Sequence, residues 1–302
     1  VTIPENVTQE QLTDILYKSH AIDKPEFFSL FCKFTTEMEY FEPGTYTIKT
    51  NYDYKQLVNT LQSGPDLGEE ITVMFREGIT VQQLAALLEE NGLHTADEIL
   101  EACNSSDYDS YSDVAAITNT SDRYYKLEGY LFPDTYEFYV KENADSALSR
   151  LLSNFQDRIM DDPDIAPLIA NSSYSLKEIV IMASLIEKET DGTDRTLISS
   201  VIHNRLNVGE TAHLLQIDAS LVYAAGREIT EDDYQTLDSP YNLYTHQGLP
   251  PTAIANAGKA SIQAALQPDK TNYYFYVLNP DTQRHVFSRT LSEHNANLRK
   301  FG

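Results

Sequence analysis

The sequence predicts an α+β protein in which small mixed units precede a mainly helical region. Three observations lead to this prediction. The first hundred residues contain a weak repeat of strand, turn and amphipathic helix. A polar stretch at 104–121, rich in Ser, Asp, Asn, Thr and Tyr, has no sustained apolar period and predicts a linker. From about residue 124 onward, helical spacing prevails, with a few short segments typical of strands.

The repeat aligns the segment that starts at Pro4 with the segment that starts at Arg76. Five pairs of residues match, namely Glu5 with Glu77, Thr8 with Thr80, Gln11 with Gln83, Leu12 with Leu84, and Leu16 with Leu88. In both copies the Thr directly precedes the apolar helical spacing, which is the place of an N-cap. Each copy therefore predicts a short strand, a turn and an amphipathic helix.

A second short helix is expected in each copy, opening near Pro25 and near Thr95. Cys32 and Cys103 fall at matching places at the ends of these second helices. Because the two cysteines occupy equivalent positions in separate units, we expect each to lie in the core of its own unit and not to form a disulfide with the other. Two cysteines are also too few for a disulfide scaffold. We therefore expect two free, buried thiols.

Between the copies, the segment Glu42–Ile48 predicts a turn that enters a strand, and Tyr54–Leu61 predicts a helix ended by Gly64 and Pro65. These patterns place two small α+β units in residues 1–104. Together with the linker, they divide the chain into three expected domains, at 1–68, 69–122 and 123–302.

The third domain is expected to contain most of the helix. Ser175 and Glu178 have the spacing of a capping box that opens an apolar helix ending near Thr190. The segment 129–139 is aromatic and extended. Further helices are expected at 144–160, 195–206, 219–225, 258–266 and after Thr290, and a strand pair at 273–278 and 285–288.

The charge balance excludes some classes of partner. The chain has 22 Lys and Arg against 46 Asp and Glu, so its formal charge is 22 − 46 = −24. This balance argues against nucleic acid and against an anionic membrane surface bound by charge alone. The longest apolar run, Ile179–Ile186, is far short of the ~18 residues of a membrane span. Because the sequence begins at Val1, we expect a further N-terminal segment, either a leader or an anchor.

Several kinds of active site have no sequence support. No Gly-rich phosphate loop follows a strand, no nucleophile elbow is present, and the seven His have no metal-type spacing. We therefore expect neither a cofactor nor a metal. What remains is carboxylate chemistry.

The strongest candidates for such chemistry are Glu187 and Glu189, at the end of the apolar helix. Two residues apart on a helix, they point to roughly opposite sides. Glu189 lies over Ile186, Leu185 and Met182, and apolar neighbours raise the pKa of a carboxyl, as a general acid requires near neutral pH. The alternative is that both are solvated charges at a helix end.

Three further segments carry polar side chains that are candidates for a binding site. Glu128 and Asp134 lie among aromatic residues, in a setting that suits a sugar face, although a plain strand and turn would explain them equally. Asp218 opens a helix and is explained as an N-cap. The loop 239–251 combines Tyr, Asn and Pro residues and suits either a binding wall or a structural loop.

These segments, in this order and spacing, closely resemble the YceG-like (MltG) family of endolytic murein transglycosylases. The resemblance covers roughly Glu42 to the C-terminus and rests on several uncommon strings. They are Leu127–Tyr136, Ala183–Thr190, His203–Leu206, Leu215–Asp218, Tyr241–Tyr244, Gly248–Pro251 and the closing Phe287, His294 and Asn295. It implies a LysM-like module around Ile71–Cys103 and a mainly helical, lysozyme-like α+β catalytic domain.

The resemblance also implies a reaction and its residues. Glu189, which Thr190 follows as in the family's motif, would be the single general acid and base that cleaves the MurNAc–GlcNAc bond of peptidoglycan and leaves 1,6-anhydro ends. The residues implied for substrate binding are Glu128, Asp134, Tyr136, Gln216, Asp218, Tyr241 and Asn242.

Partners and location follow from the same resemblance. It implies glycan strands as substrate, peptidoglycan synthases as partners, and a single N-terminal membrane helix that places the chain on the extracytoplasmic side. The high net charge favours a monomer for the fragment.

Three alternatives stay open at this point. One is a lysozyme-like hydrolase that uses Asp191, Asp194 or Asp218 as a second carboxylate. Another is a non-catalytic cell-wall binding protein. The third, an aminodeoxychorismate lyase, needs pyridoxal phosphate, for which the sequence offers no phosphate cradle.

Overall fold

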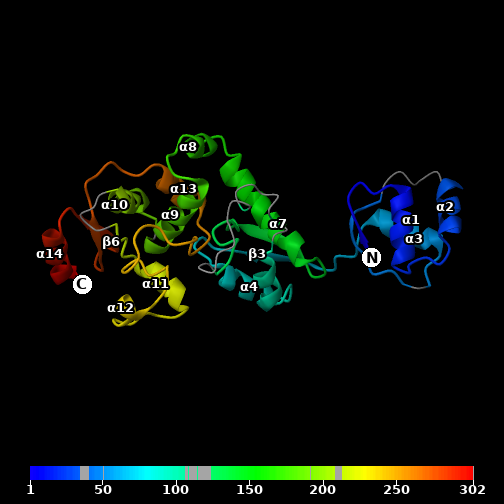
Figure 1. Cartoon of the computed structure of the whole chain (residues 1–302), viewed down its shortest axis with the longest axis horizontal. Helices are drawn as coiled ribbons and strands as arrows, with labels where there is room; N and C mark the ends of the chain where they lie inside the picture. The colour runs from blue at the N-terminus through cyan, green and yellow to red at the C-terminus, as the bar shows by residue number, and fades with distance from the viewer. Residues whose placement is uncertain are drawn as a thin grey trace. The chain divides into compact units, whose positions relative to one another are not determined.

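The protein is described from a computed structural model, which covers residues 1–34, 41–49, 51–105, 108, 114, 124–190, 192–207 and 213–301. The expected linker at 104–121 lies almost wholly outside these residues. The chain divides into two compact units, Val1–Glu69 and Glu70–Gly302, which are described separately (Figure 1). Each combines helices with short strands, so the mixed α+β class predicted from the sequence is confirmed.

The first unit packs three helices against a short antiparallel strand pair. Its elements are β1 (Thr2–Ile3), α1 (Gln9–Lys18), α2 (Pro25–Phe34), β2 (Gly44–Thr45) and α3 (Tyr54–Ser63). Leu12 and Leu16 of α1, Phe28 of α2, and Leu57 and Leu61 of α3 are all fully buried in one core. Burial of these side chains is the main force that holds such a small unit together.

The second unit opens with a strand, two helices and a returning strand. These are β3 (Glu70–Met74), α4 (Val81–Glu90), α5 (Ala96–Ala102) and β4 (Thr135–Tyr139). The two strands pair antiparallel, with Val73 opposite Tyr136. Residues from 69–122 and from 123–302, expected as separate domains, therefore share a sheet, and they also share one hydrophobic core.

The internal repeat is visible in the helix starts. Thr8 caps α1 and Thr80 caps α4, and in each case a Gln three residues later completes a capping box. Cys32 and Cys103 are both free and buried, as predicted, and they belong to different hydrophobic cores.

The remaining elements precede or follow α9 (Leu176–Glu189) in the chain, and α9 begins at the predicted capping box of Ser175 and Glu178. They are α7 (Ala144–Phe155), the π-helical turn Gln156–Met160, α8 (Ala166–Ala170), α10 (Arg195–Asn207), α11 (Asp218–Ala225), α12 (Asp233–Thr236), α13 (Lys259–Leu266), β5 (Phe275–Asn279), β6 (Arg284–Ser288) and α14 (Leu291–Phe301). The helix expected at 144–160 thus changes from α to π geometry after Phe155.

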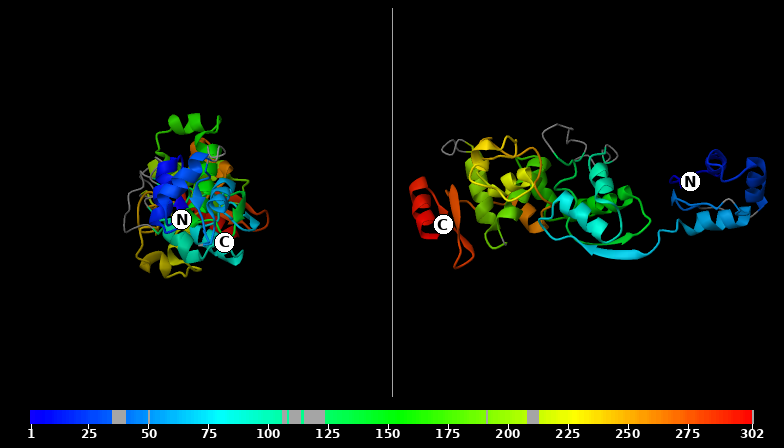
Figure 2. Two further views of the ribbon diagram at one scale, coloured as in Figure 1. Left: turned by 90° about the vertical axis from the view of Figure 1, so that its right-hand side faces the viewer. Right: turned by 90° about the horizontal axis from the view of Figure 1, so that it is seen from below.

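The central position of α9 explains its composition. Every residue from Ile179 to Ile186 is buried, because α10, α11 and α13 all pack against this helix (Figure 1). The antiparallel pair β5–β6 and α14 lie together at one end of the unit (Figure 2). No helix in the described part of the chain is long and apolar enough to span a bilayer.

A buried asparagine connects the segment from β3 to β4 (70–139), called here the strand–helix module, to the helical region that follows it. Asn256 accepts hydrogen bonds from the backbone N–H of Gly129 (2.9 Å) and of Leu131 (3.0 Å), and its amide donates to the Ile79 carbonyl (3.0 Å). Gly129 has φ +94°, and a Cβ there would lie 2.6 Å from both the Ala253 Cβ and the Val180 Cγ1. Only glycine fits this crossing without displacing the chain.

We expect Gly129→Ala to destabilise the protein strongly. The added methyl group would combine a left-handed backbone with overpacking, which together cost about 2–4 kcal/mol. Gly226→Ala is the matched control, because Gly226 also has a positive φ (+63°) but has open space around its Cβ position. It should cost about 1 kcal/mol. Urea denaturation of both variants measures the difference, and equal losses would contradict the packing argument.

Candidate active site

A cavity of about 490 Å³ opens beside the C-terminal end of α9. Its walls come from α9, α10, the start of α11 and the segment before it, β5 and the residue before it, α14 and the loop after α12. The lining residues are Glu189, Arg205, Leu215, Gln216, Asp218, Tyr244, Tyr274, Phe275, Tyr276, Leu291, His294, Asn295 and Leu298. Three of the predicted site residues, Glu189, Gln216 and Asp218, are thus brought together.

Glu189 is the last residue of α9, and its side chain turns into the cavity. The Tyr276 hydroxyl on β5 donates a hydrogen bond to Glu189 Oε2 at 2.8 Å. The backbone N–H of Ala219, in the first turn of α11, also contributes a hydrogen bond. The carboxyl is therefore held by two elements that are distant from α9 in the sequence.

The surroundings of Glu189 raise its pKa to about 7. Burial is the main cause, because it disfavours the charged form, and the negative charge of Asp218 adds to the effect. The hydrogen bonds from Tyr276 and Ala219 act in the opposite direction. With a pKa near neutrality, this carboxyl can both give and take a proton, as the apolar spacing of α9 predicts.

Asp218 is not the N-cap of α11, so that explanation of the residue is wrong. The cap position belongs to Ile217, and Asp218 is the first helical residue. Its carboxylate instead accepts hydrogen bonds from the hydroxyls of Tyr244 and Tyr234, the latter at 3.1 Å. The two tyrosine rings meet edge to face, 4.6 Å apart. A ring pair thus fixes an anionic group close to Glu189.

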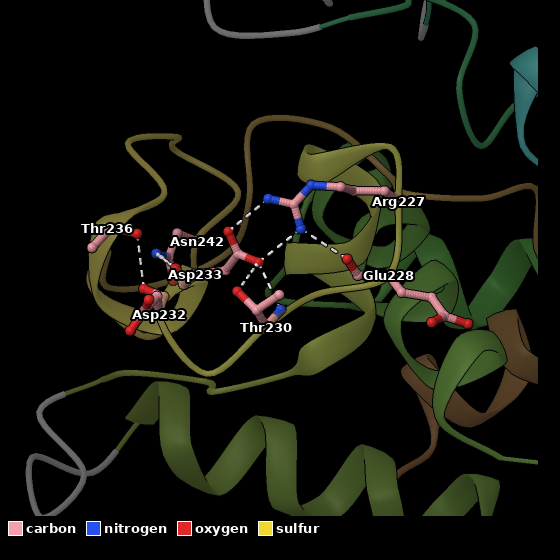
Figure 3. Close-up of polar contacts among 7 residues, drawn as sticks. All are labelled: Arg227, Glu228, Thr230, Asp232, Asp233, Thr236 and Asn242. Atoms are coloured by element: carbon pink, nitrogen blue, oxygen red, sulfur yellow. Dashed lines mark hydrogen bonds and ion pairs between the residues drawn. The ribbon is translucent and has the colours of Figure 1, made fainter.

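The segment 227–244, which includes α12 and carries both tyrosines, is held by an ion pair. Arg227 contacts both carboxylate oxygens of Asp233 at 2.8 Å, and the Thr230 backbone N–H and hydroxyl donate to the same carboxylate (Figure 3). These contacts keep the pKa of Asp233 well below its usual range, chiefly through the Arg227 hydrogen bonds. Asp233 immediately precedes Tyr234, so the ion pair anchors the backbone beside one Asp218 donor.

Tyr241 and Asn242, expected to bind substrate, belong to the same segment but are buried and do not line the cavity. The Asn242 amide donates to the Leu237 carbonyl at 3.0 Å, and its Oδ1 accepts from the Tyr244 backbone N–H at 3.1 Å. Tyr241 is buried and its hydroxyl contacts Thr252 at 2.7 Å. Both residues shape the loop that presents Tyr244.

Glu128 also lies outside the cavity. It is buried, accepts from the Val81 backbone N–H (3.1 Å) and the Tyr223 hydroxyl (3.0 Å), and contacts the Asn256 amide. Burial raises its pKa to about 8 despite these donors. Its place at the first turn of α4 links the strand–helix module to the helical region.

Asp134 and Tyr136 form a separate cluster at the start of β4. The Asn154 amide donates to Asp134 Oδ2 at 3.2 Å and to the Tyr136 hydroxyl oxygen at 2.8 Å. Arg158 also reaches Asp134, at 3.4 Å. Neither residue lines the cavity that contains Glu189.

Glu187 points away from Glu189, as the helical spacing predicts. The alternative that both are solvated charges is wrong, because the Glu187 side chain is only 7% exposed. Arg195 contacts Glu187 at 3.3 Å, and the Gly258 backbone N–H donates to it at 3.1 Å. Glu187 therefore joins α9 to α10 and to the start of α13.

The candidate second carboxylates differ in position. Asp218 lies in the cavity, whereas Asp194 bonds the His285 backbone N–H (2.9 Å) and lies outside it. Asp191 is outside the described residues. In the described part of the chain, no group of three or more His, Cys, Asp or Glu side chains is placed to hold a metal ion.

Tyr276, Tyr244 and Arg205 contribute to the cavity without having been predicted from the sequence. Tyr276 lies in a strand-like segment with no motif of its own, and Arg205 lies in a helix of ordinary spacing. Tyr244 and Arg205 do fall inside two of the strings that carry the family resemblance. Their place in these strings was the one feature of the sequence that could have indicated a role in the site.

A carboxyl whose pKa is raised to about 7, in a cavity lined by tyrosines, fits the class of enzymes that use general acid–base catalysis. The family is established by comparison. Residues 1–300 match the model of the YceG-like family, and the chain belongs to it.

Known proteins resemble the chain over its whole length. A Bacillus subtilis (strain 168) protein named endolytic murein transglycosylase is 30% identical, and the match covers 100% of this chain and 84% of the relative. A Streptococcus pneumoniae serotype 2 protein of the same name is 25% identical, and the match covers 99% of this chain and 57% of that protein. A crystal structure of a yceG-like protein from Listeria monocytogenes aligns with a TM-score of 0.66 and 29% identity, covering 98% of both chains.

Two substitutions should move the pKa of Glu189 in opposite directions. Tyr276→Phe removes a hydrogen bond that stabilises the carboxylate, so the pKa should rise above about 7. Asp218→Asn removes a neighbouring negative charge, so the pKa should fall. Carbon-detected NMR titration of the labelled carboxyl measures both. Shifts of the same sign in the two variants would contradict this account of the site.

Proposed function

We propose that this chain is an endolytic murein transglycosylase in which Glu189 is the only catalytic acid and base. The observation that carries the proposal is the raised pKa of Glu189 inside the cavity. Membership of the YceG-like family, and the name endolytic murein transglycosylase of the Bacillus and Streptococcus relatives, support the same reaction and peptidoglycan as substrate.

In the proposed mechanism, protonated Glu189 donates its proton to the bridging oxygen while the bond from that oxygen to the muramic C1 breaks. The resulting carboxylate takes the proton from the C6 hydroxyl of the same sugar, and O6 bonds to C1. The products are a free GlcNAc O4 hydroxyl and a 1,6-anhydro end, and no water is consumed. An intramolecular nucleophile has a high effective concentration, so one carboxylate can suffice.

Asp218 has a supporting role in this scheme. Its charge raises the pKa of Glu189 and would also stabilise positive charge that develops at C1. Because Asp218 lies in the same cavity as Glu189, a hydrolase is the second candidate function. Ordinary glycosidases use two carboxyl groups in one active site. The tyrosine hydroxyls that already donate to Asp218 favour a fixed anion over an activator of water.

The segment from β3 to β4 supports a LysM-like module in the proposal. The residues implied for that module, Ile71–Cys103, contain most of β3 together with α4 and α5, and β3 pairs antiparallel with β4. A glycan contact there would add a second attachment to a long strand and raise the effective concentration at the cavity. The helical remainder would be the lysozyme-like catalytic part.

We expect Glu189→Gln to abolish cleavage of uncrosslinked glycan strands and to keep the fold. The amide cannot exchange a proton, and general acid–base transfer is worth about 10²–10⁴ in rate. Because burial disfavours the ionised carboxyl, the variant should melt at the same or a higher temperature above pH 7. Mass spectrometry of the wild-type products should find muramic ends lighter by one water than hydrolysis would give.

Glu187→Gln is the matched control for this experiment. It makes the same chemical change two residues away, on the side of α9 that faces Arg195. It should lower stability modestly and retain much of the activity. If Glu189→Gln were active and Glu187→Gln inactive, the assignment of Glu189 as the catalytic acid would be wrong. Products with reducing muramic ends would favour the hydrolase.

We further propose that the protein acts at the outer face of the cytoplasmic membrane, held by a single helix and working beside peptidoglycan synthases. The support is the family resemblance alone. Fractionation of the full-length gene product tests the location. It should be recovered with membranes and resist high salt, whereas release by salt would contradict the proposed anchor, because only charge attraction is screened.

A further inference from the structure

We infer that Gln216 is a hydrogen-bond donor for the carbonyl oxygen of a sugar N-acetyl group, and so makes the cavity selective for N-acetylated strands. This inference rests on the proposed function and deepens it. It follows from the orientation of one side-chain amide, which the neighbouring arginine determines.

Arg205 fixes which end of the Gln216 amide faces the cavity. Arg205 Nη2 donates to Gln216 Oε1 at 2.8 Å. Since a guanidinium has donors and no acceptor, the amide cannot be turned around without losing this contact. Nε2, with its two N–H donors, is therefore the end left for a ligand. In the described part of the chain it donates to no other residue.

The residues that hold this amide are themselves fixed. Arg205 is buried, its Nη1 donates to the Leu215 carbonyl, and its guanidinium lies 5.2 Å from the centre of the Phe275 ring. Gln216 has a left-handed backbone (φ +54°), and its N–H donates to the Leu243 carbonyl at 3.1 Å. A left-handed conformation is costly for a residue with a side chain, and such residues cluster at functional sites.

The other polar groups of the cavity complement this donor. Glu189 and Asp218 accept hydrogen bonds and can receive sugar hydroxyls, whereas the Tyr276 and Tyr244 hydroxyls already donate to them. An acetamido carbonyl can only accept, so it needs a free donor. The Asn295 amide also lines the cavity, but no contact within the described residues fixes which end it presents. Of the two side-chain amides that line the cavity, Gln216 is therefore the one whose donor end is fixed.

Removal of the acetyl group gives a direct way to test the assignment. A de-N-acetylated sugar replaces the carbonyl acceptor with an ammonium group, which has only donors to present to Gln216 Nε2. A site built around a hydrogen bond discriminates strongly against a ligand that leaves its donor unpaired. The wild-type protein should therefore prefer N-acetylated strands.

Gln216→Glu replaces the hydrogen-bond donor that faces the cavity with an acceptor, in a side chain of the same shape. The new carboxylate keeps its contact with Arg205 and presents an acceptor to the cavity. Relative to the wild type, kcat/KM should fall about 10- to 100-fold for N-acetylated strands and stay equal or rise for de-N-acetylated strands. Gln263→Glu, on the exposed side of α13, makes the same change in charge away from the cavity and should alter neither value.

Binding provides a second measurement that does not need turnover. In a Glu189→Gln background, the Kd ratio for de-N-acetylated over N-acetylated strand fragments should drop when Gln216→Glu is added. An unchanged ratio, or an equal loss for both kinds of strand, would overturn the role of Gln216. A protein that binds with the expected ratio but never cleaves would contradict the proposed function and leave the assignment of Gln216 intact.

Discussion

The burial of α9 on all sides is the constraint on which the site depends. Eight consecutive buried residues, from Ile179 to Ile186, fix the axis and rotation of this helix, because a shift would expose apolar side chains on one face or crowd them on another. The two glutamates that follow are therefore delivered to opposite sides. Glu187 meets Arg195 and the start of α13, and Glu189 enters the cavity.

The chemistry of the cavity comes from a balance of opposing effects on one carboxyl. Burial and the charge of Asp218 raise the pKa of Glu189, and hydrogen bonds from Tyr276 and Ala219 lower it. A value of about 7 leaves both protonation states accessible. A second network fixes the position of the Asp218 charge that acts on Glu189. Tyr234 and Tyr244 donate hydrogen bonds to Asp218, and the ion pair of Arg227 and Asp233 anchors the segment that carries both tyrosines.

The polar groups buried away from the cavity connect parts of the fold. Glu128 accepts hydrogen bonds from the Val81 backbone N–H at the start of α4 and from the Tyr223 hydroxyl of α11, and Asn256, which precedes α13, accepts from the Gly129 backbone N–H. Unpaired, each would be a costly buried group, so their partners must remain in place. These contacts of Glu128 and Asn256 hold the residues near α4 against the residues near α13, which belong to the same hydrophobic core. The close packing also leaves no room for a side chain at Gly129.

The sequence by itself determined the features that depend on local contacts. The capping boxes of α1, α4 and α9 close within three residues, so the order of Thr or Ser and Gln or Glu was enough to place the helix starts. The apolar spacing likewise placed Glu189 over apolar neighbours, and the family resemblance chose it over Glu187. Tertiary structure alone decided that Tyr276, 87 residues away, would bond Glu189, and that Asp218 would hold tyrosines rather than cap a helix. The burial of Asn242 and the orientation of the Gln216 amide were also decided by tertiary structure. Both depend on contacts between segments that are distant in the sequence, and a local sequence pattern carries no information about such contacts.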